Sequence, residues 1–139
     1  MVPELDGVLY KEIVEQALRE FPNECCGVVA ANGHGRPAKI FPARNIDAST
    51  ATYRIDPIDL MRIQDEIDAE DWRVWAFFHS HTHSEAYPSR TDREQASHAQ
   101  DWYPGVRYLI VSLTDREQPE LRSFFMLDGN VEEEELSIA

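Results

Sequence analysis

The chain has 139 residues, of which 42% are hydrophobic, and its 26 acidic and 13 basic residues give it a formal net charge of −13. An acidic surface repels phosphate backbones, which argues against general nucleic-acid binding. The sequence contains no apolar run of about 18 residues that could span a membrane, and it begins without the pattern of a secretory signal. We therefore expect one cytoplasmic globular domain over residues 1–139, with no membrane partner.

The first third of the chain predicts a helix followed by a β-hairpin. Apolar residues recur every four positions across residues 8–21, which is the spacing of an amphipathic helix. The apolar run "CCGVVAA" at residues 25–31 is typical of a strand, and the turn-like "NGHGRP" leads to a return strand at residues 38–46. The segment "TATYRID" at residues 50–56 is expected to be extended.

The hairpin begins with the only two cysteines, Cys25 and Cys26. Adjacent cysteines rarely bond to each other, and a cytosolic setting keeps thiols reduced. We favour small apolar residues of the strand over a nucleophile or a metal ligand. The sequence has no Cys-x-x-Cys, which excludes a thiolate zinc knuckle.

The middle of the chain alternates helix and strand. Asp56 followed by Pro57 is typical of a helix start, and the apolar spacing behind it predicts a helix to residue 69. Residues 72–81 ("WRVWAFFHSH") are rich in aromatic residues and valine, which favours a strand. A polar loop follows, and a short helix is expected to open at Ser89.

The last third predicts three strands. Residues 107–113 ("RYLIVSL") form a continuous apolar run, typical of a central buried strand. Residues 120–127 and 130–138 are two more strands joined by a turn, and the acidic run at residues 132–135 indicates a solvated face or an edge strand. Because helices and strands mix without regular βαβ alternation, we expect an α/β fold with a mixed sheet.

Two histidines at the end of the predicted aromatic strand are candidate metal ligands. Alternate side chains of a strand point to one face, so His79 and His81 can converge on one ion. An exposed polar loop is the alternative interpretation for a histidine pair alone. The role of His83 stays open between a group beside the ligands, a substrate contact and an exposed side chain.

A nearby carboxylate, Asp92, could supply the third ligand. Two histidines and one carboxylate match catalytic zinc sites, and also redox iron sites. The segment from Ser89 to Asp92 equally has the form of a helix capping box. We expect these two roles to compete, because an aspartate bound to a metal is not free to reach back to the N-cap amide.

A hydrolytic metal site needs a group that carries protons. Glu24 precedes an apolar strand, and a carboxylate at such a position is unusual because buried acids need partners. A solvated acid at a loop end is the alternative interpretation. Glu85 is a rival for the same role, although its predicted loop would fix it less well.

Taken together, these residues resemble the motif of the JAMM (MPN-plus) metalloproteases. His79-x-His81 is followed after seven residues by Ser89-x-x-Asp92, with Glu24 far upstream, and "HSH" followed by "YPSRTD" is a close match. The resemblance covers nearly the whole chain. It implies an MPN fold similar to that of cytidine deaminases, with a mixed β-sheet flanked by helices and one catalytic domain over residues 1–139.

The resemblance also implies the chemistry. Zinc would be held by His79, His81 and Asp92 with water as fourth ligand, Glu24 would act as general base and then acid, and Ser89 would stabilise the oxyanion. These roles imply hydrolysis of an amide or isopeptide bond without a covalent intermediate.

Within the family, the chain has Thr82 where many members carry proline. This form is similar to a bacterial subgroup whose characterised type is a peptidase acting on a small ubiquitin-like sulfur carrier that ends in Gly-Gly. That peptidase releases cysteine formed on the carrier and completes a route of cysteine biosynthesis. The resemblance implies such a carrier as the partner.

Other functions remain open at this point. A broader, desampylase-like isopeptidase for ubiquitin-like conjugates has the same chemistry, and a catalytically silent MPN binding module has the same fold. A zinc deaminase would need a Cys-x-x-Cys, which the chain lacks. The sequence leaves the oligomeric state undetermined, a homodimer included.

Overall fold

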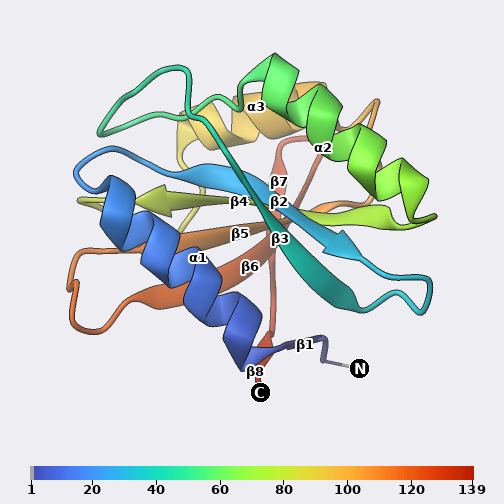
Figure 1. Ribbon diagram of the computed structural model, residues 1–139. Helices are drawn as coiled ribbons and strands as arrows, with labels where there is room; N and C mark the ends of the chain where they lie inside the picture. Colours follow the sequence, from blue (N-terminus) through green and yellow to red (C-terminus); the bar gives the residue numbers. More distant parts are fainter. Residues whose placement is uncertain (1) are drawn as a thin grey trace.

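The structure is a computed structural model and describes residues 2–139 (Figure 1). Helices α1, α2 and α3 flank a main sheet, and two very short strands pair near the termini. In chain order the elements are β1 (Glu4–Leu5), α1 (Gly7–Glu20), β2 (Cys26–Ala31), β3 (Pro37–Ala43), α2 (Pro57–Ala69), β4 (Arg73–His81), α3 (Arg90–Ala99), β5 (Arg107–Ser112), β6 (Glu120–Leu127), β7 (Asn130–Glu134) and β8 (Ser137–Ile138).

The main sheet has six strands in the order β3-β2-β4-β5-β6-β7. Strands β4 and β5 pair in parallel, and the other neighbours pair antiparallel. The expected α/β fold with a mixed sheet is therefore confirmed. Because β4 and β5 run the same way, their carboxyl ends meet at one edge, where His81 pairs with Ser112.

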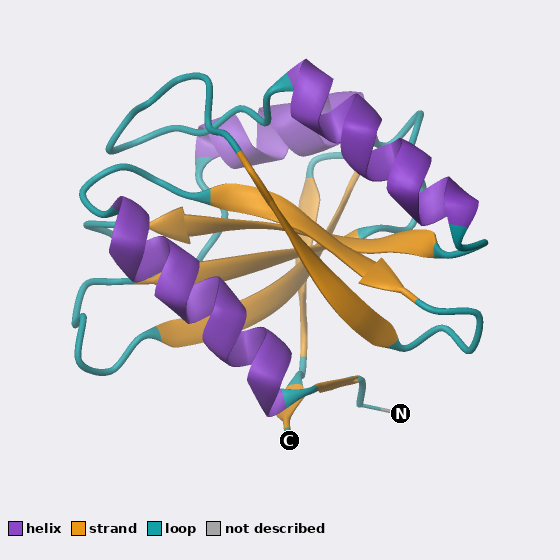
Figure 2. Ribbon diagram, in the orientation of Figure 1, coloured by secondary structure: helices purple, strands orange, loops and turns teal. Residues whose placement is uncertain are grey.

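The helices cover opposite faces of the sheet, as Figure 2 shows. Helix α1 packs on one face, while α2 and α3 pack on the other. The local signals explain where the helices begin: Asp56 accepts a hydrogen bond from the Ile58 N–H at 2.9 Å, and Pro57 occupies the first turn of α2. No helix among residues 2–139 is long and apolar enough to cross a membrane.

The alternation of side chains divides most of the core into two large clusters, and a small third cluster contains Ala86, Ile110 and Phe124. Cys25, Val29 and Phe78 belong to the α1 side, and Cys26 and Phe77 belong to the side of α2 and α3. The two cysteines are buried and free, as expected. They contribute to opposite faces of the sheet, which separates their thiols.

Two expected strands differ from the structure. The return strand of the hairpin stops at Ala43, because the next N–H, that of Arg44, donates to the Asp59 carboxylate at 2.8 Å instead of continuing the ladder. Residues 50–56, expected to be extended, contain no helix and form a bridge from Ile55 to Asn45.

The predicted last strand, residues 130–138, is divided in two. β7 lies at the edge of the main sheet, as the acidic run indicated. The chain then turns so that Leu136 packs against the α1-side core, and β8 pairs in parallel with β1, a strand too short to leave a signal in the sequence.

Candidate metal centre

Three ligand atoms meet at the carboxyl end of β4. The Nε2 atoms of His79 and His81 lie 3.1 Å apart, and each lies 3.0 Å from Oδ2 of Asp92. The three side chains are buried, and among residues 2–139 they are the group of three whose ligand atoms could hold one metal ion. Ligand atoms about 2.0 to 2.1 Å from a zinc ion sit at separations of this size, so the triangle fits a small divalent cation.

The strand and the loop after it fix the orientation of His81. Its Nδ1 lies 2.7 Å from the carbonyl oxygen of Glu85, which can only accept, so Nδ1 carries the proton. In the neutral ring Nε2 then carries a lone pair that is available to a metal ion, and in the protonated ring Nε2–H donates to Asp92 at 3.0 Å. A hydrogen bond of this kind to the far nitrogen is the usual support of a metal-bound histidine.

Asp92 serves the helix and the cluster with the same oxygen. Its Oδ2 accepts the backbone N–H of Ser89 at 2.9 Å, while the Ser89 hydroxyl accepts the Asp92 N–H at 3.1 Å. The capping box is therefore complete, and Oδ2 still faces both histidines. In this structure the two roles do not exclude each other, because one carboxylate oxygen accepts the N–H and faces the histidines.

The charges of the three groups depend on one another. Burial lowers the pKa of His79, against the opposing effect of Asp92, so this imidazole stays neutral. Burial also works against protonation of His81, but the hydrogen bond to Asp92 raises its pKa. Although burial opposes the ionisation of Asp92, the charge and hydrogen bonds of the histidines hold its pKa well below the usual range. An ionised carboxylate beside a neutral imidazole is the state that binds a metal ion.

Glu24 lies beside this cluster with its carboxyl group buried. Its side chain is 3% exposed, and Oε1 has no hydrogen-bond partner within residues 2–139. Burial raises the pKa of Glu24 to about 7, with His81 and Asp92 contributing in opposite directions. A carboxyl group poised near neutral pH can take up and return a proton, which suits a general base and acid.

The backbone around Glu24 is held from both sides. Its N–H donates to the Ser49 carbonyl at 2.8 Å, and its carbonyl accepts from the Asn45 amide at 3.1 Å. The next residue, Cys25, donates its N–H to the hydroxyl of Ser80 at 2.8 Å. Since Ser80 stands between the two histidines of β4, this bond ties the glutamate segment to the metal-binding strand.

Several residues of the site were not found from the sequence. Tyr53 stacks on the His79 ring with centroids 4.1 Å apart and planes at 19°, and Asn45 organises the loop beside Glu24. The Glu85 carbonyl orients His81, whereas the Glu85 side chain is exposed and directed to solvent. A stacked ring or a backbone carbonyl leaves no local pattern, so no sequence signal could have identified these contacts.

Of the remaining candidates, Ser89 is half-buried at the start of α3 and His83 is exposed. The Ser89 oxygen accepts the Asp92 N–H, which leaves its hydroxyl proton free to donate. The structure thus brings together Glu24, His79, His81, Ser89 and Asp92, whereas His83 lies outside the triangle.

The chain is similar to several known proteins. The chain matches the family described as prokaryotic homologs of the JAB domain (Prok-JAB) over residues 7–127. It is 36% identical over 131 residues to the CysO-cysteine peptidase of Mycobacterium tuberculosis, covering 94% of this chain and 86% of that protein. It is also 36% identical over 100 residues to the desampylase of Haloferax volcanii, covering 70% of this chain and 68% of that protein.

Solved structures extend the likeness to the fold. A protein from Desulfitobacterium hafniense superposes with a TM-score of 0.84 and 28% identity, covering 100% of this chain and 93% of that one. A JAB1/MPN domain protein from Archaeoglobus fulgidus superposes with a TM-score of 0.59 and 16% identity, covering 99% and 98%. The second is a likeness of fold alone.

Proposed function

Because this chain belongs to the Prok-JAB family, we propose that it is a zinc-dependent metallopeptidase that cleaves the bond after the C-terminal diglycine of a small ubiquitin-like sulfur carrier and releases cysteine. Residues 1–139 would act as one catalytic domain. The observation that carries the proposal is the buried Glu24, whose Oε1 has no hydrogen-bond partner among residues 2–139, beside a triangle of two imidazoles and a carboxylate.

The residues present fit a zinc ion. His79, His81 and Asp92 would hold it, with Nε2, Nε2 and Oδ2 as ligand atoms. When bound, zinc lowers the pKa of a water molecule and polarises a carbonyl group. The triangle supplies three protein ligands, the number typical of catalytic zinc sites that keep one position for water.

Glu24 moves the protons of the reaction. As the base, its carboxylate takes a proton from the attacking water; as the acid, it returns that proton to the leaving amine. Burial raises the pKa of this carboxyl group to about 7, and a bound cation beside it would lower that pKa and favour the carboxylate that acts as the base. Its backbone hydrogen bonds keep the carboxyl group at a fixed place during both steps.

Ser89 is the N-cap of α3 and bonds to the ligand Asp92. Its hydroxyl proton is free to donate, and the N-cap geometry holds the side chain at the first turn of α3. A donor aimed at a developing oxyanion stabilises the transition state by about 3 to 4 kcal/mol. We assign this role to Ser89.

The relatives support the substrate class. The CysO-cysteine peptidase aligns with nearly the whole chain, so we transfer the amide bond to cysteine as the preferred target. The desampylase alignment supports a second candidate, an isopeptidase for ubiquitin-like conjugates. Both candidates share the zinc site and the proton carrier and differ in the leaving group.

An intact-mass assay tests the proposal. The zinc-loaded protein is mixed with a sulfur carrier ending in Gly-Gly-Cys, and with the same carrier joined through its diglycine to a lysine side chain. Loss of one cysteine residue from the first substrate, blocked by a chelator, is expected. Cleavage of the lysine conjugate alone would favour the isopeptidase.

Two matched variants locate the proton carrier in the same assay. Glu24→Gln should keep zinc and lower turnover by about 10³-fold, within the range for general acid–base catalysis. Glu85→Gln removes an exposed carboxylate close to the site and should leave turnover unchanged. A near-normal rate for Glu24→Gln would contradict the assigned mechanism.

A further inference from the structure

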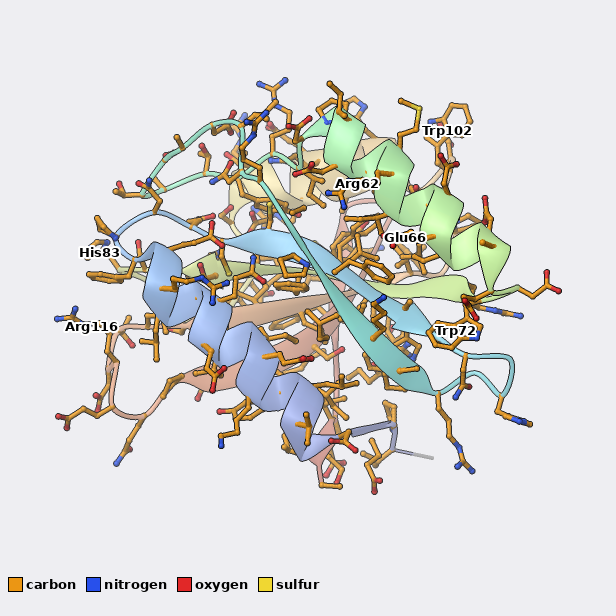
Figure 3. The ribbon with its side chains drawn as sticks, viewed as in Figure 1. Arg62, Glu66, Trp72, His83, Trp102 and Arg116 are labelled. Atoms are coloured by element: carbon orange, nitrogen blue, oxygen red, sulfur yellow. The ribbon has the colours of Figure 1, made fainter. Side chains whose placement is uncertain are left out.

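An exposed cationic corner lies beside the metal centre, formed by Phe21, His83 and Arg116. The Arg116 guanidinium stacks over the Phe21 ring, with Cζ 4.4 Å from the centroid. The Phe21 and His83 rings lie 5.8 Å apart. Figure 3 shows His83 and Arg116 on the same side of the molecule, at the end where α1 and β4 finish. Arg116 makes no ion pair within the part of the chain that the structure describes.

Each part of this corner is attached to an element of the site. The loop that carries Arg116 follows β5, and its first residue, Leu113, donates its N–H to the carbonyl of His81 at 2.9 Å. Phe21 closes α1, with its N–H bonded to the Ala17 carbonyl at 3.1 Å, three residues before Glu24. The corner is therefore tied to the chain segment that leads to Glu24 and, through Leu113, to the strand that carries the histidines.

A hydrogen-bond chain fixes the His83 ring. The Thr82 hydroxyl has one proton, which it donates to the Thr50 carbonyl at 2.9 Å. The 2.9 Å contact between Thr82 Oγ1 and His83 Nδ1 must then have the ring N–H as donor. This bond anchors the ring beside Phe21, and Arg116 supplies the positive charge of the corner.

The geometry of the proposed reaction suggests a role for the positive charge of Arg116. Glu24 protonates the leaving amine, so the released residue lies on the Glu24 side. In a free amino acid the α-carboxylate is one carbon away from that amine. A carboxylate entering here would be repelled by Asp92 and by the net charge of −13. A guanidinium group opposes that repulsion and offers paired N–H donors that match a carboxylate.

We propose that Arg116 binds the free α-carboxylate of the amino acid that the enzyme releases. The inference rests on the proposed function and sharpens it. A C-terminal residue is selected by its carboxylate, whereas a lysine within a conjugated protein presents no carboxylate at this position. Arg116 is then a specificity-determining residue on the leaving-group side.

Peptide binding tests the inference without turnover. Acetyl-Gly-Gly-Ala, made as the carboxylate and as the carboxamide, is titrated into zinc-loaded Glu24→Gln protein by NMR. We expect the carboxylate to bind about tenfold more tightly, the value of one charge-assisted hydrogen-bond pair. Adding Arg116→Gln should abolish the difference, and Arg116→Lys should keep part of it.

The control is Arg36→Gln, which removes the same charge from an exposed turn at the far end of β2 and should leave the preference intact. Equal affinities for the two peptides, or a preference that survives Arg116→Gln, would overturn the inference.

Activity separates the inference from the proposed function. With carriers ending in Gly-Gly-Cys, Arg116→Gln should lower kcat/KM about tenfold for the carboxylate through KM and leave the carboxamide unchanged. An equal loss on both substrates counts against the inference while the peptidase stands. If the wild type cleaves neither carrier, the proposed function fails, and the peptide titration still decides whether Arg116 binds a carboxylate.

Discussion

Both faces of β4 are buried, but their side chains have different roles. On the α1 side, Phe78 packs in an entirely apolar cluster with residues such as Ile13. On the side of α2 and α3, Phe77 is followed at the same parity by His79 and His81, whose ring nitrogens face a carboxylate. Both faces also hold buried polar groups: Ser80, on the same face as Phe78, accepts the N–H of Cys25 at 2.8 Å. The second face differs because its polar side chains bring ligand atoms together beside Asp92.

The largest effect on zinc binding and turnover is expected at the ligand triangle, on the face of β4 that α2 and α3 cover. His81→Ala removes one corner of the ligand triangle and leaves Asp92 buried beside a single imidazole. We expect stoichiometric zinc binding to be lost and turnover to fall below detection, measured by metal analysis after dialysis and by the intact-mass assay. A His81→Ala protein that keeps both zinc and activity would show that the triangle is not the metal site.

Substitutions on the α1 side of β4 should change the stability of the protein and leave its metal binding unchanged. Phe78 is fully buried, and its ring lies against Gly27, where no side chain could fit. Phe78→Ala should lower the free energy of unfolding by about 3 to 5 kcal/mol, measured by urea denaturation. Phe77 instead lines a surface pocket of about 420 Å³, so Phe77→Ala should cost at least about 1 kcal/mol less. Equal costs would erase the contrast between the faces.

Part of this contrast could be predicted from the sequence. The His-x-His spacing at the end of an aromatic strand places both imidazoles on one face because strand side chains alternate. The Ser-x-x-Asp spacing predicts the start of α3, and the structure has a capping box there. Local patterns of this kind are decided by residues that are close in the chain.

The remaining features depend on distant contacts. The stacking of Tyr53 on His79 and the bond from His81 to the Glu85 carbonyl arise when loops fold over the strand. The pairing of β8 with β1 depends on the packing of Leu136 against the core on the α1 side of the sheet. Neither kind of contact requires a particular residue at a fixed spacing, so the sequence gives no signal for it.

A smaller effect concerns the cost of keeping Glu24 buried. Its pKa is raised from 4.5 to about 7, so the folded state binds the proton more tightly than the unfolded chain. Folding therefore loses stability as pH rises from about 4.5 to 7, and the loss is complete above 7. In zinc-free protein, Glu24→Gln should raise the unfolding free energy at pH 8 by about 3 kcal/mol and change little at pH 4.

The exposed Glu85 provides the comparison for this measurement. Glu85→Gln should leave the pH dependence of unfolding as it is in the wild type. A stability gain for Glu24→Gln that is the same at pH 4 and pH 8 would mean that ionisation of the buried carboxyl group is not its cause.

Next in size is the loss of a helix cap next to the ligand triangle. Ser89→Ala removes the acceptor of the Asp92 N–H and should lower the unfolding free energy by about 1 kcal/mol. If the hydroxyl also stabilises the oxyanion, kcat should fall by about 10²-fold. Asp56→Ala removes the corresponding cap of α2, a helix that carries none of the three ligands, and should reduce stability with no change in kcat. Equal kcat values for the two variants would show that Ser89 acts only as a helix cap.

The smallest effect is expected for the reactivity of the two cysteines, whose side chains lie on opposite faces of the sheet. Cys25 contributes to the α1 side and Cys26 to the other side, and both thiols are fully buried. Burial raises the pKa of Cys25 to about 12 and also raises the pKa of Cys26 above its usual range. Because the thiolate is the reactive form, folded protein at pH 8 should not react with a disulfide reagent, whereas urea-unfolded protein should release two equivalents. Rapid reaction of one thiol in the folded state would show that one face of the sheet opens to solvent, and mass mapping of the labelled cysteine would identify which.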